Sequence, residues 1–218
     1  MAYHIDAENI SLDDLQKRIE ETDLVPSRAS LLEKLGPKMK LLERHGIRTL
    51  ACLRDELKTT NRVEAVANAT GIDVQYLTLL RREIEGYFPR SFALKSFDWL
   101  PGSEIAKLER SGIKDTAALY EATDTRQKRT ALVKSTGIDD TILETLAQLA
   151  GLTRVQWVSP TAARLVIESG YKSAAELARA DAGELDEAFS RVNAGNRLFK
   201  GRIGLRDIKR LIQAARYI

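Results

Sequence analysis

The chain contains Glu43-Arg44-His45-Gly46-Ile47 and, 66 residues later, Glu109-Arg110-Ser111-Gly112-Ile113. A second segment recurs at the same spacing, because Thr70-Gly71-Ile72-Asp73 returns as Thr136-Gly137-Ile138-Asp139. Short coincidental matches would not keep this mutual register. The two copies therefore indicate a duplicated structural unit.

A more diverged third copy follows the first two. Its segments are Glu168-Ser169-Gly170-Tyr171 and Ile203-Gly204-Leu205-Arg206-Asp207, and nine more residues separate them than in the earlier copies. This alignment predicts that Gly204 takes the place held by Gly71 and Gly137.

Short helices are the expected building blocks of each copy. Leu, Ala, Glu, Lys and Arg dominate the chain, and the alternating β-branched runs typical of strands are absent. Gly46 is well placed to end a helix in the left-handed conformation. Ser11 and Asp14 predict a capping box. The other expected N-terminal caps are Thr49, Asp73, Asp115, Asp139 and Ser173.

The predicted fold is all-α, with tandem helix-hairpin-helix-like repeats of short helices. A single hairpin cannot bury its apolar face, so consecutive hairpins are expected to stack into a compact array. Residues 1–95 would form lead-in helices and the first repeat, and residues 96–218 the second and third repeats with a basic C-terminal helix. The aromatic residues of the connector, residues 86–97, predict an ordered segment. Trp99 and Trp157 occupy equivalent positions and are expected to pack internally.

The composition is that of a soluble globular protein. Of the 218 residues, 44% are hydrophobic and 30% are charged, which is too apolar for a disordered chain. No apolar stretch approaches the roughly 20 residues needed to cross a bilayer, so we expect no membrane partner. The polar start of the chain does not resemble a signal peptide. One cysteine, Cys52, is typical of a protein of the reducing cytoplasm.

No catalytic constellation is visible in the sequence. The two histidines, His4 and His45, are far apart, and one cysteine cannot supply a zinc site. There is no phosphate-binding glycine loop for a nucleotide. The sequence therefore predicts a non-enzymatic protein without a metal or another cofactor.

Basic residues are concentrated at the C-terminal end of the chain. Residues 196–218, the terminal basic segment, contain seven Lys or Arg and one acid, whereas the preceding residues have a net charge of −3. The cations are Arg197, Lys200, Arg202, Arg206, Lys209, Arg210 and Arg216. Arg206, Lys209 and Arg210 lie three and four apart, so they are expected to share one helix face. Lys200 and Arg202 lie on the loop before that helix, whose N-terminus could help to bind phosphate.

The alternative to phosphate binding is that these cations only form the solvent-exposed face of the helix, while its apolar residues pack inward. A second basic cluster, Arg81, Arg82, Arg90 and Lys95, surrounds aromatic residues of the connector. Cations interleaved with aromatic rings can stack on unpaired bases, although such rings more often pin a connector to the core.

Four segments resemble the family named domain of unknown function 4332. They are residues 24–28 (Leu-Val-Pro-Ser-Arg), 82–89 (Arg-Glu-Ile-Glu-Gly-Tyr-Phe-Pro), 149–155 (Leu-Ala-Gly-Leu-Thr-Arg-Val) and 199–209 (Phe-Lys-Gly-Arg-Ile-Gly-Leu-Arg-Asp-Ile-Lys). The resemblance implies a helical fold and no particular activity. The repeated Gly-Ile hairpins also resemble the helix-hairpin-helix superfamily, which by analogy implies DNA binding.

The hairpin turns depart from the pattern that grips DNA phosphates. That pattern has Gly-hydrophobic-Gly, so that bare backbone N–H groups approach the phosphate. The corresponding positions here are Glu33-Lys34-Leu35, Trp99-Leu100-Pro101 and Trp157-Val158-Ser159. These departures weaken the hypothesis that the turns themselves grip DNA, with Gly36 and Gly102, one residue away, as partial substitutes.

The leading hypothesis is a nucleic-acid-binding protein that contacts the phosphate backbone of DNA or RNA with low sequence specificity. Its candidate contacts are Lys200, Arg202, Arg206, Lys209 and Arg210, followed by Arg81, Arg82, Arg90 and Lys95. The alternative is a protein–protein adaptor that does not bind nucleic acid. Phosphate binding should weaken steeply as salt rises, whereas apolar docking should not.

Overall fold

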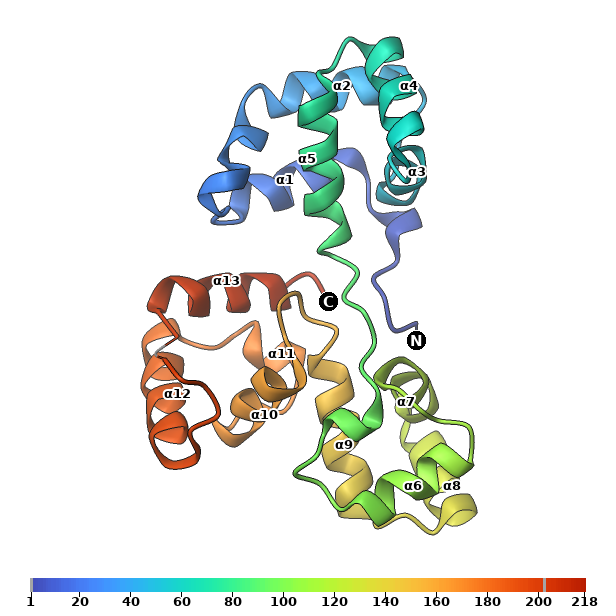
Figure 1. Ribbon diagram of the computed structural model, residues 1–218, viewed down its shortest axis with the longest axis vertical. Coiled ribbons are helices and arrows are strands. Elements are labelled where there is room, and N and C mark those ends of the chain that lie inside the picture. The colour runs from blue at the N-terminus through green and yellow to red at the C-terminus, as the bar shows by residue number, and fades with distance from the viewer. Residues whose placement is uncertain (1, 202) are drawn as a thin grey trace. The chain divides into compact units, whose positions relative to one another are not determined.

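The computed structural model describes residues 2–201 and 203–218 and is built of helices (Figure 1). Over these residues the β contacts are two isolated bridges, Ser11 with Thr49 and Ala93 with Asp115. The all-α fold class is thus confirmed. No helix within the described ranges has the length and apolarity that a membrane crossing requires.

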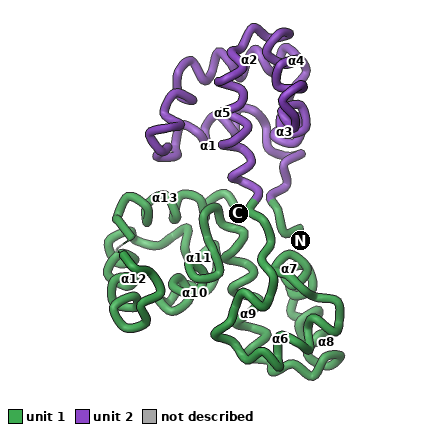
Figure 2. The backbone as a smooth tube through the Cα atoms, viewed as in Figure 1, with its two compact units in different colours: residues 1–4, 89–218 green, residues 5–88 purple. Residues whose placement is uncertain are grey.

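The chain divides into two compact units (Figure 2). The N-terminal unit is Ile5–Phe88, and the C-terminal unit combines Met1–His4 with Pro89–Ile218. The predicted division was after residue 95. The boundary lies earlier because Leu94 and Phe97, both fully buried, belong to the core of the C-terminal unit, whereas Phe88 belongs to the other core.

The N-terminal unit is a bundle of short helices. They are η1 (Ala7–Asn9), α1 (Leu12–Glu21), η2 (Pro26–Leu32), α2 (Leu35–Arg44), α3 (Leu50–Glu56), α4 (Thr60–Thr70) and α5 (Val74–Glu85). The capping box of Ser11 and Asp14 starts α1, as predicted. The hydrogen bonds that Ser11 donates to the carboxylate of Asp14 lower the pKa of that carboxyl group. Helix α5 packs against α3, α4 and η2 and closes the core.

An ion pair with a buried carboxylate joins η2 to α5. Arg28 forms an ion pair with Glu83, whose side chain is 3% exposed, and also donates a 3.0 Å hydrogen bond to the carbonyl of Arg82. Arg18 is buried as well, with its guanidinium 3.6 Å from the ring centre of Tyr87. The Pro26-Ser27-Arg28 segment thus places its arginine in an ion pair that joins two elements of the unit.

The C-terminal unit contains the remaining helices. They are η3 (Leu94–Ser96), α6 (Gly102–Arg110), α7 (Thr116–Thr123), α8 (Arg126–Thr136), α9 (Asp140–Leu152), α10 (Pro160–Glu168), α11 (Ala174–Leu177), α12 (Ala182–Asn196) and α13 (Leu205–Ala215). Helix α9 packs against α7, α8 and α10, and α13 packs against α12 and α11.

Residues from the start of the chain complete this unit. Tyr3 is 3% exposed, and its hydroxyl donates a 3.1 Å hydrogen bond to Thr153 and accepts one of 3.2 Å from Thr116. Arg154 donates a 2.7 Å bond to the carbonyl of Tyr3 and another to the hydroxyl of Tyr120. Burial lowers the pKa of Arg154. The first residues are therefore part of the C-terminal core.

Structure recurs at the spacing found in the sequence. Helices α4 and α8 begin and end 66 residues apart, with threonine N-caps and left-handed glycine C-caps at Gly71 and Gly137. Gly46, Gly112 and Gly170 are left-handed as well, with φ of 92°, 91° and 98°. The predicted caps at Thr49, Asp73, Asp115, Asp139 and Ser173 are all present. The helix-hairpin-helix-like character of the repeats stays a prediction.

The third copy differs from its predicted alignment. The residue that ends α12 in the left-handed conformation is Arg197, with φ of 50°. Gly204 has φ of −76° and instead precedes α13 as its N-cap. Its place is thus that of Asp73 and Asp139, and the prediction that Gly204 matches Gly71 and Gly137 was wrong.

The left-handed cap gives a stability prediction. Gly137→Ala should lower the free energy of unfolding of the C-terminal unit by about 1 kcal/mol, because φ of 67° brings a Cβ close to the following carbonyl. Gly102→Ala is the control, since Gly102 lies in the first turn of α6 and a Cβ there meets nothing within 4 Å. That change should be neutral or stabilising. Urea unfolding followed by tryptophan fluorescence measures both, and equal effects would contradict the prediction.

Candidate nucleic-acid interface

The last helix, α13, separates an apolar face from a basic face. Ile208 and Ile212 are buried, whereas Arg206 and Lys209, three residues apart, are exposed. Gly204 has no side chain to cap the first turn of α13. Two cations therefore face solvent within the first turns of a helix whose positive dipole end lies nearby.

Arg210 does not share this exposed face as expected. Its side chain is only 12% exposed, and its guanidinium lies 3.5 Å from the carboxylate of Asp207. Asp207 is itself 63% exposed and reduces the positive charge of the first turn. A nucleic acid approaching α13 would thus meet Arg206 and Lys209 rather than Arg210.

The loop before α13 is anchored to α12 by one asparagine. The side chain of Asn193 accepts a 2.8 Å hydrogen bond from the N–H of Phe199 and donates a 3.1 Å bond to the Phe199 carbonyl. Lys200 follows directly and is exposed. Arg202, also expected to contact phosphate, lies outside the described residues.

A hollow of about 370 Å³, called the α12 hollow here, opens beside this loop. Its lining residues are Leu165, Phe189, Ser190, Asn193, Ala194, Lys200, Gly201 and Ile203. Leu165 and Phe189 are buried and give it an apolar floor, while Lys200 supplies a charge at the rim. Sequence patterns did not reveal this hollow, because its residues come from α10, α12 and a loop.

The second predicted cluster is divided between the two units. Arg81 and Arg82 lie on α5 of the N-terminal unit, whereas Arg90 and Lys95 belong to the C-terminal unit, where both are exposed. Arg82 is exposed and lines a hollow of about 610 Å³ that also contains the carboxylates of Glu33 and Asp73. The two carboxylates make this hollow less favourable for binding a polyanion than the α12 hollow, where Lys200 lies.

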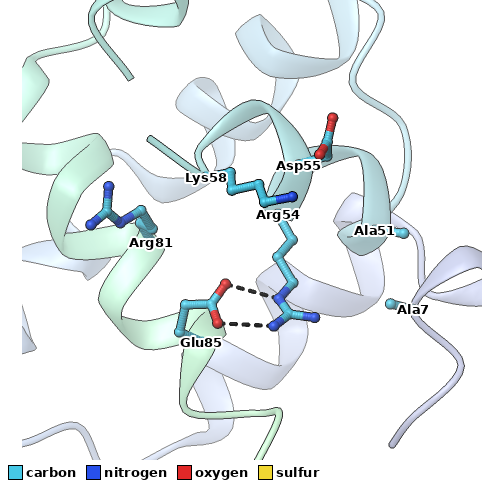
Figure 3. A pocket seen from close by; sticks show the side chains of 7 residues that line it. All are labelled: Ala7, Ala51, Arg54, Asp55, Lys58, Arg81 and Glu85. Carbon is cyan, nitrogen blue, oxygen red and sulfur yellow. Dashed lines mark hydrogen bonds and ion pairs between the residues drawn. The ribbon is translucent and has the colours of Figure 1, made fainter. Parts of the chain in front are cut away.

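Arg81 lines a hollow of about 530 Å³ between α3 and α5 (Figure 3). Its lining residues are Ala7, Ala51, Arg54, Asp55, Lys58, Arg81 and Glu85. The guanidinium of Arg54 donates hydrogen bonds of 2.8 and 3.0 Å to the carboxylate of Glu85, as the dashed lines show. A hydrogen bond from Arg62, and then its charge, lower the pKa of Asp55. The hollow mixes both charges, so it is no dedicated anion site.

The two tryptophans, expected to pack internally, differ from each other. Trp99 is partly buried, with its ring 5.4 Å from that of Phe97 and the guanidinium of Arg164 5.1 Å away. Trp157 is 54% exposed and has φ of 71°, so the expectation of internal packing was wrong for it. The adjacent residues Gln156 and Val158 are buried, whereas the indole is exposed. No sequence signal distinguished the two positions.

Left-handed backbone occurs at two of the three hairpin turns that lack the expected glycines. Lys34 and Trp157 have φ of 53° and 71°. These two turns therefore contain a residue with a large side chain in a backbone conformation that glycine adopts at no steric cost.

No group of three or more His, Cys, Asp or Glu side chains that could hold a metal ion lies within residues 2–201 and 203–218.

Comparison with known proteins identifies one family. A model of the family described as Domain of unknown function (DUF4332) matches residues 102–218, which is about half of the chain and includes α13 and the α12 hollow. No curated protein and no solved structure shows significant similarity to the chain. Of the four resembling segments, those at 149–155 and 199–209 lie within the match. The chain belongs to the family described as Domain of unknown function (DUF4332).

Proposed function

We propose that this protein binds nucleic acid through the phosphate backbone, with low sequence specificity and without catalysing a reaction. The observation that supports this function is the exposed pair Arg206 and Lys209 on α13, together with exposed Lys200 on the preceding loop. Phosphate contacts from Lys and Arg release counterions, which gives affinity without reading the sequence.

Charge reversal of the pair tests the proposal. Arg206→Glu/Lys209→Glu should weaken binding to a short oligonucleotide at least tenfold in low salt, because two attractive phosphate contacts become repulsive. The slope of log K against log salt should become shallower by about 1.4 to 1.8, since each phosphate contact contributes about 0.7 to 0.9. Fluorescence anisotropy at several salt concentrations measures both quantities.

The matched control is Arg126→Glu/Lys134→Glu on α8. Both residues are exposed in the same unit, and the net charge changes by the same amount. This variant should keep most of the affinity. If both double variants lose affinity equally, the effect comes from total charge and α13 is not the binding site. Arg210→Glu is unsuitable, because it would put a second carboxylate beside Asp207.

A protein–protein adaptor is the second candidate, and Trp157 is the observation that favours it. An exposed tryptophan held in a strained backbone conformation between buried neighbours presents a rigid apolar anchor. A complex formed through it would respond little to salt. If the protein binds no oligonucleotide at low salt but a partner protein binds and Trp157→Ala removes that binding, the adaptor function replaces the first proposal.

A further inference from the structure

The α12 hollow differs from the other two hollows described above in the chemistry of its lining. Among the described residues that line it, none carries a carboxylate, and the charged side chain is the cation Lys200. Phe189 and Leu165 are 4% and 1% exposed and form an apolar floor. Ser190, which is exposed, adds a hydroxyl group that can form hydrogen bonds. This combination suits a flat, apolar group attached to an anion.

The rim of the hollow is held in place by α12. The amide group of Asn193 bonds both the N–H and the carbonyl of Phe199, so it fixes the backbone next to Lys200. The same side chain also approaches the carbonyl of Gly201 at 3.5 Å. A pre-formed loop costs less conformational entropy when a ligand binds.

The hollow lies next to the basic face of α13. Ile203 lines the hollow, and Arg206 follows three residues later, so their Cα atoms are at most about 11 Å apart. Successive phosphates of an extended strand are several ångströms apart. One strand could therefore place a base in the hollow and a neighbouring phosphate near Arg206 and Lys209.

We infer that the α12 hollow binds one unpaired base of a single strand, so that the protein prefers single-stranded to double-stranded nucleic acid. This inference rests on the proposed function, because the phosphates of the same strand would bind α13. A duplex cannot offer the face of a base, since its bases are paired and stacked. The apolar floor at Leu165 and Phe189 would contact the base, and Lys200 its phosphate.

Three labelled probes of 12 nucleotides test the inference by fluorescence anisotropy at one low salt concentration. They are oligo-dT, a strand of the same length whose residues are all abasic, and the dT·dA duplex. The abasic strand keeps every phosphate and removes only the bases. Oligo-dT should bind about tenfold more tightly than either of the others, as expected for a contact with one base.

Two variants of adjacent α12 residues locate the contact. Ala194→Leu narrows the hollow with an aliphatic side chain, whereas Gly195→Leu places the same side chain just outside the lining. Both positions are exposed, so both variants should fold. Ala194→Leu should remove the preference for oligo-dT over the abasic strand, and Gly195→Leu should retain it. Ser190→Leu, at another lining position, should act like Ala194→Leu.

The outcomes separate this inference from the proposed function. If oligo-dT and the abasic strand bind equally tightly, or if Ala194→Leu keeps the preference, the inference is overturned while backbone binding by α13 stands. If no probe binds at low salt, both fail together. A tenfold preference that disappears in Ala194→Leu and persists in Gly195→Leu supports the base-binding hollow.

Discussion

Glu83→Ala is expected to lower the free energy of unfolding of the N-terminal unit by about 3 kcal/mol. Glu83 is 3% exposed and neutralises Arg28, whose side chain is only 27% exposed. Removing the carboxylate would leave the charge of Arg28 partly buried without this partner, and buried Arg18 lies on the ring of nearby Tyr87. The cost is therefore mainly that of a charge left without its buried counter-ion.

Urea unfolding followed by circular dichroism measures this effect. Both tryptophans, Trp99 and Trp157, belong to the C-terminal unit, so their fluorescence reports that unit separately. The control is Glu85→Ala, which breaks the ion pair with Arg54, where both side chains are 40% or more exposed. An exposed pair stabilises by less than about 1 kcal/mol. If Glu83→Ala and Glu85→Ala destabilise equally, the ion pair with the buried carboxylate is not a major source of stability.

Tyr3→Ala is expected to lower the free energy of unfolding of the C-terminal unit by about 3 kcal/mol, as for other buried aromatic side chains. Tyr3 packs against Tyr120, with ring centres 6.1 Å apart, and its hydroxyl is hydrogen-bonded to Thr116 and Thr153. The truncation would remove the ring and leave two buried hydroxyl groups without this partner.

Tyr3→Phe separates the two contributions, because it keeps the ring and removes only the hydroxyl. Its expected cost is about 1 kcal/mol, the usual net contribution of a hydrogen bond. Tryptophan fluorescence during urea unfolding follows both variants. A Tyr3→Ala transition identical to that of the unchanged protein would show that the first residues do not stabilise the C-terminal core.

Local signals in the sequence predicted most of the helix boundaries. Glycines with positive φ and N-terminal Thr, Asp and Ser caps act within one helical turn, so their effects depend on nearby residues alone. Gly46 and Gly137 end their helices as expected, and Asp73 and Asp139 begin theirs. The same local chemistry explains why the prediction of Gly204 as a left-handed helix end was wrong. Glycine is also accepted at an N-cap, and Arg197 adopts the left-handed conformation instead.

The candidate site was only partly predictable. The spacing of Arg206 and Lys209 placed both on one face of a helix, and both are exposed. Burial of Arg210 depends on how α13 packs, and the proximity of Asp207 is a matter of side-chain direction. The α12 hollow combines residues from α10, α12 and a loop, and no local pattern relates such distant segments.

The amino-acid sequence by itself determined the helical class, the duplicated register of 66 residues and most helix ends, because these depend on short-range periodicity and capping. Tertiary structure alone decided which side chains distant in the sequence meet. Positions 54 and 88 hold Arg54 over the ring of Phe88 at 3.9 Å, and the equivalent positions, 120 and 154, hold Tyr120 under Arg154 at 4.2 Å. The arginine and the aromatic residue have exchanged positions between the two copies. Equivalent positions in the repeat therefore do not contain the same residues in the same roles. Long-range packing sets these contacts, since it depends on the shape and charge of residues distant in the chain.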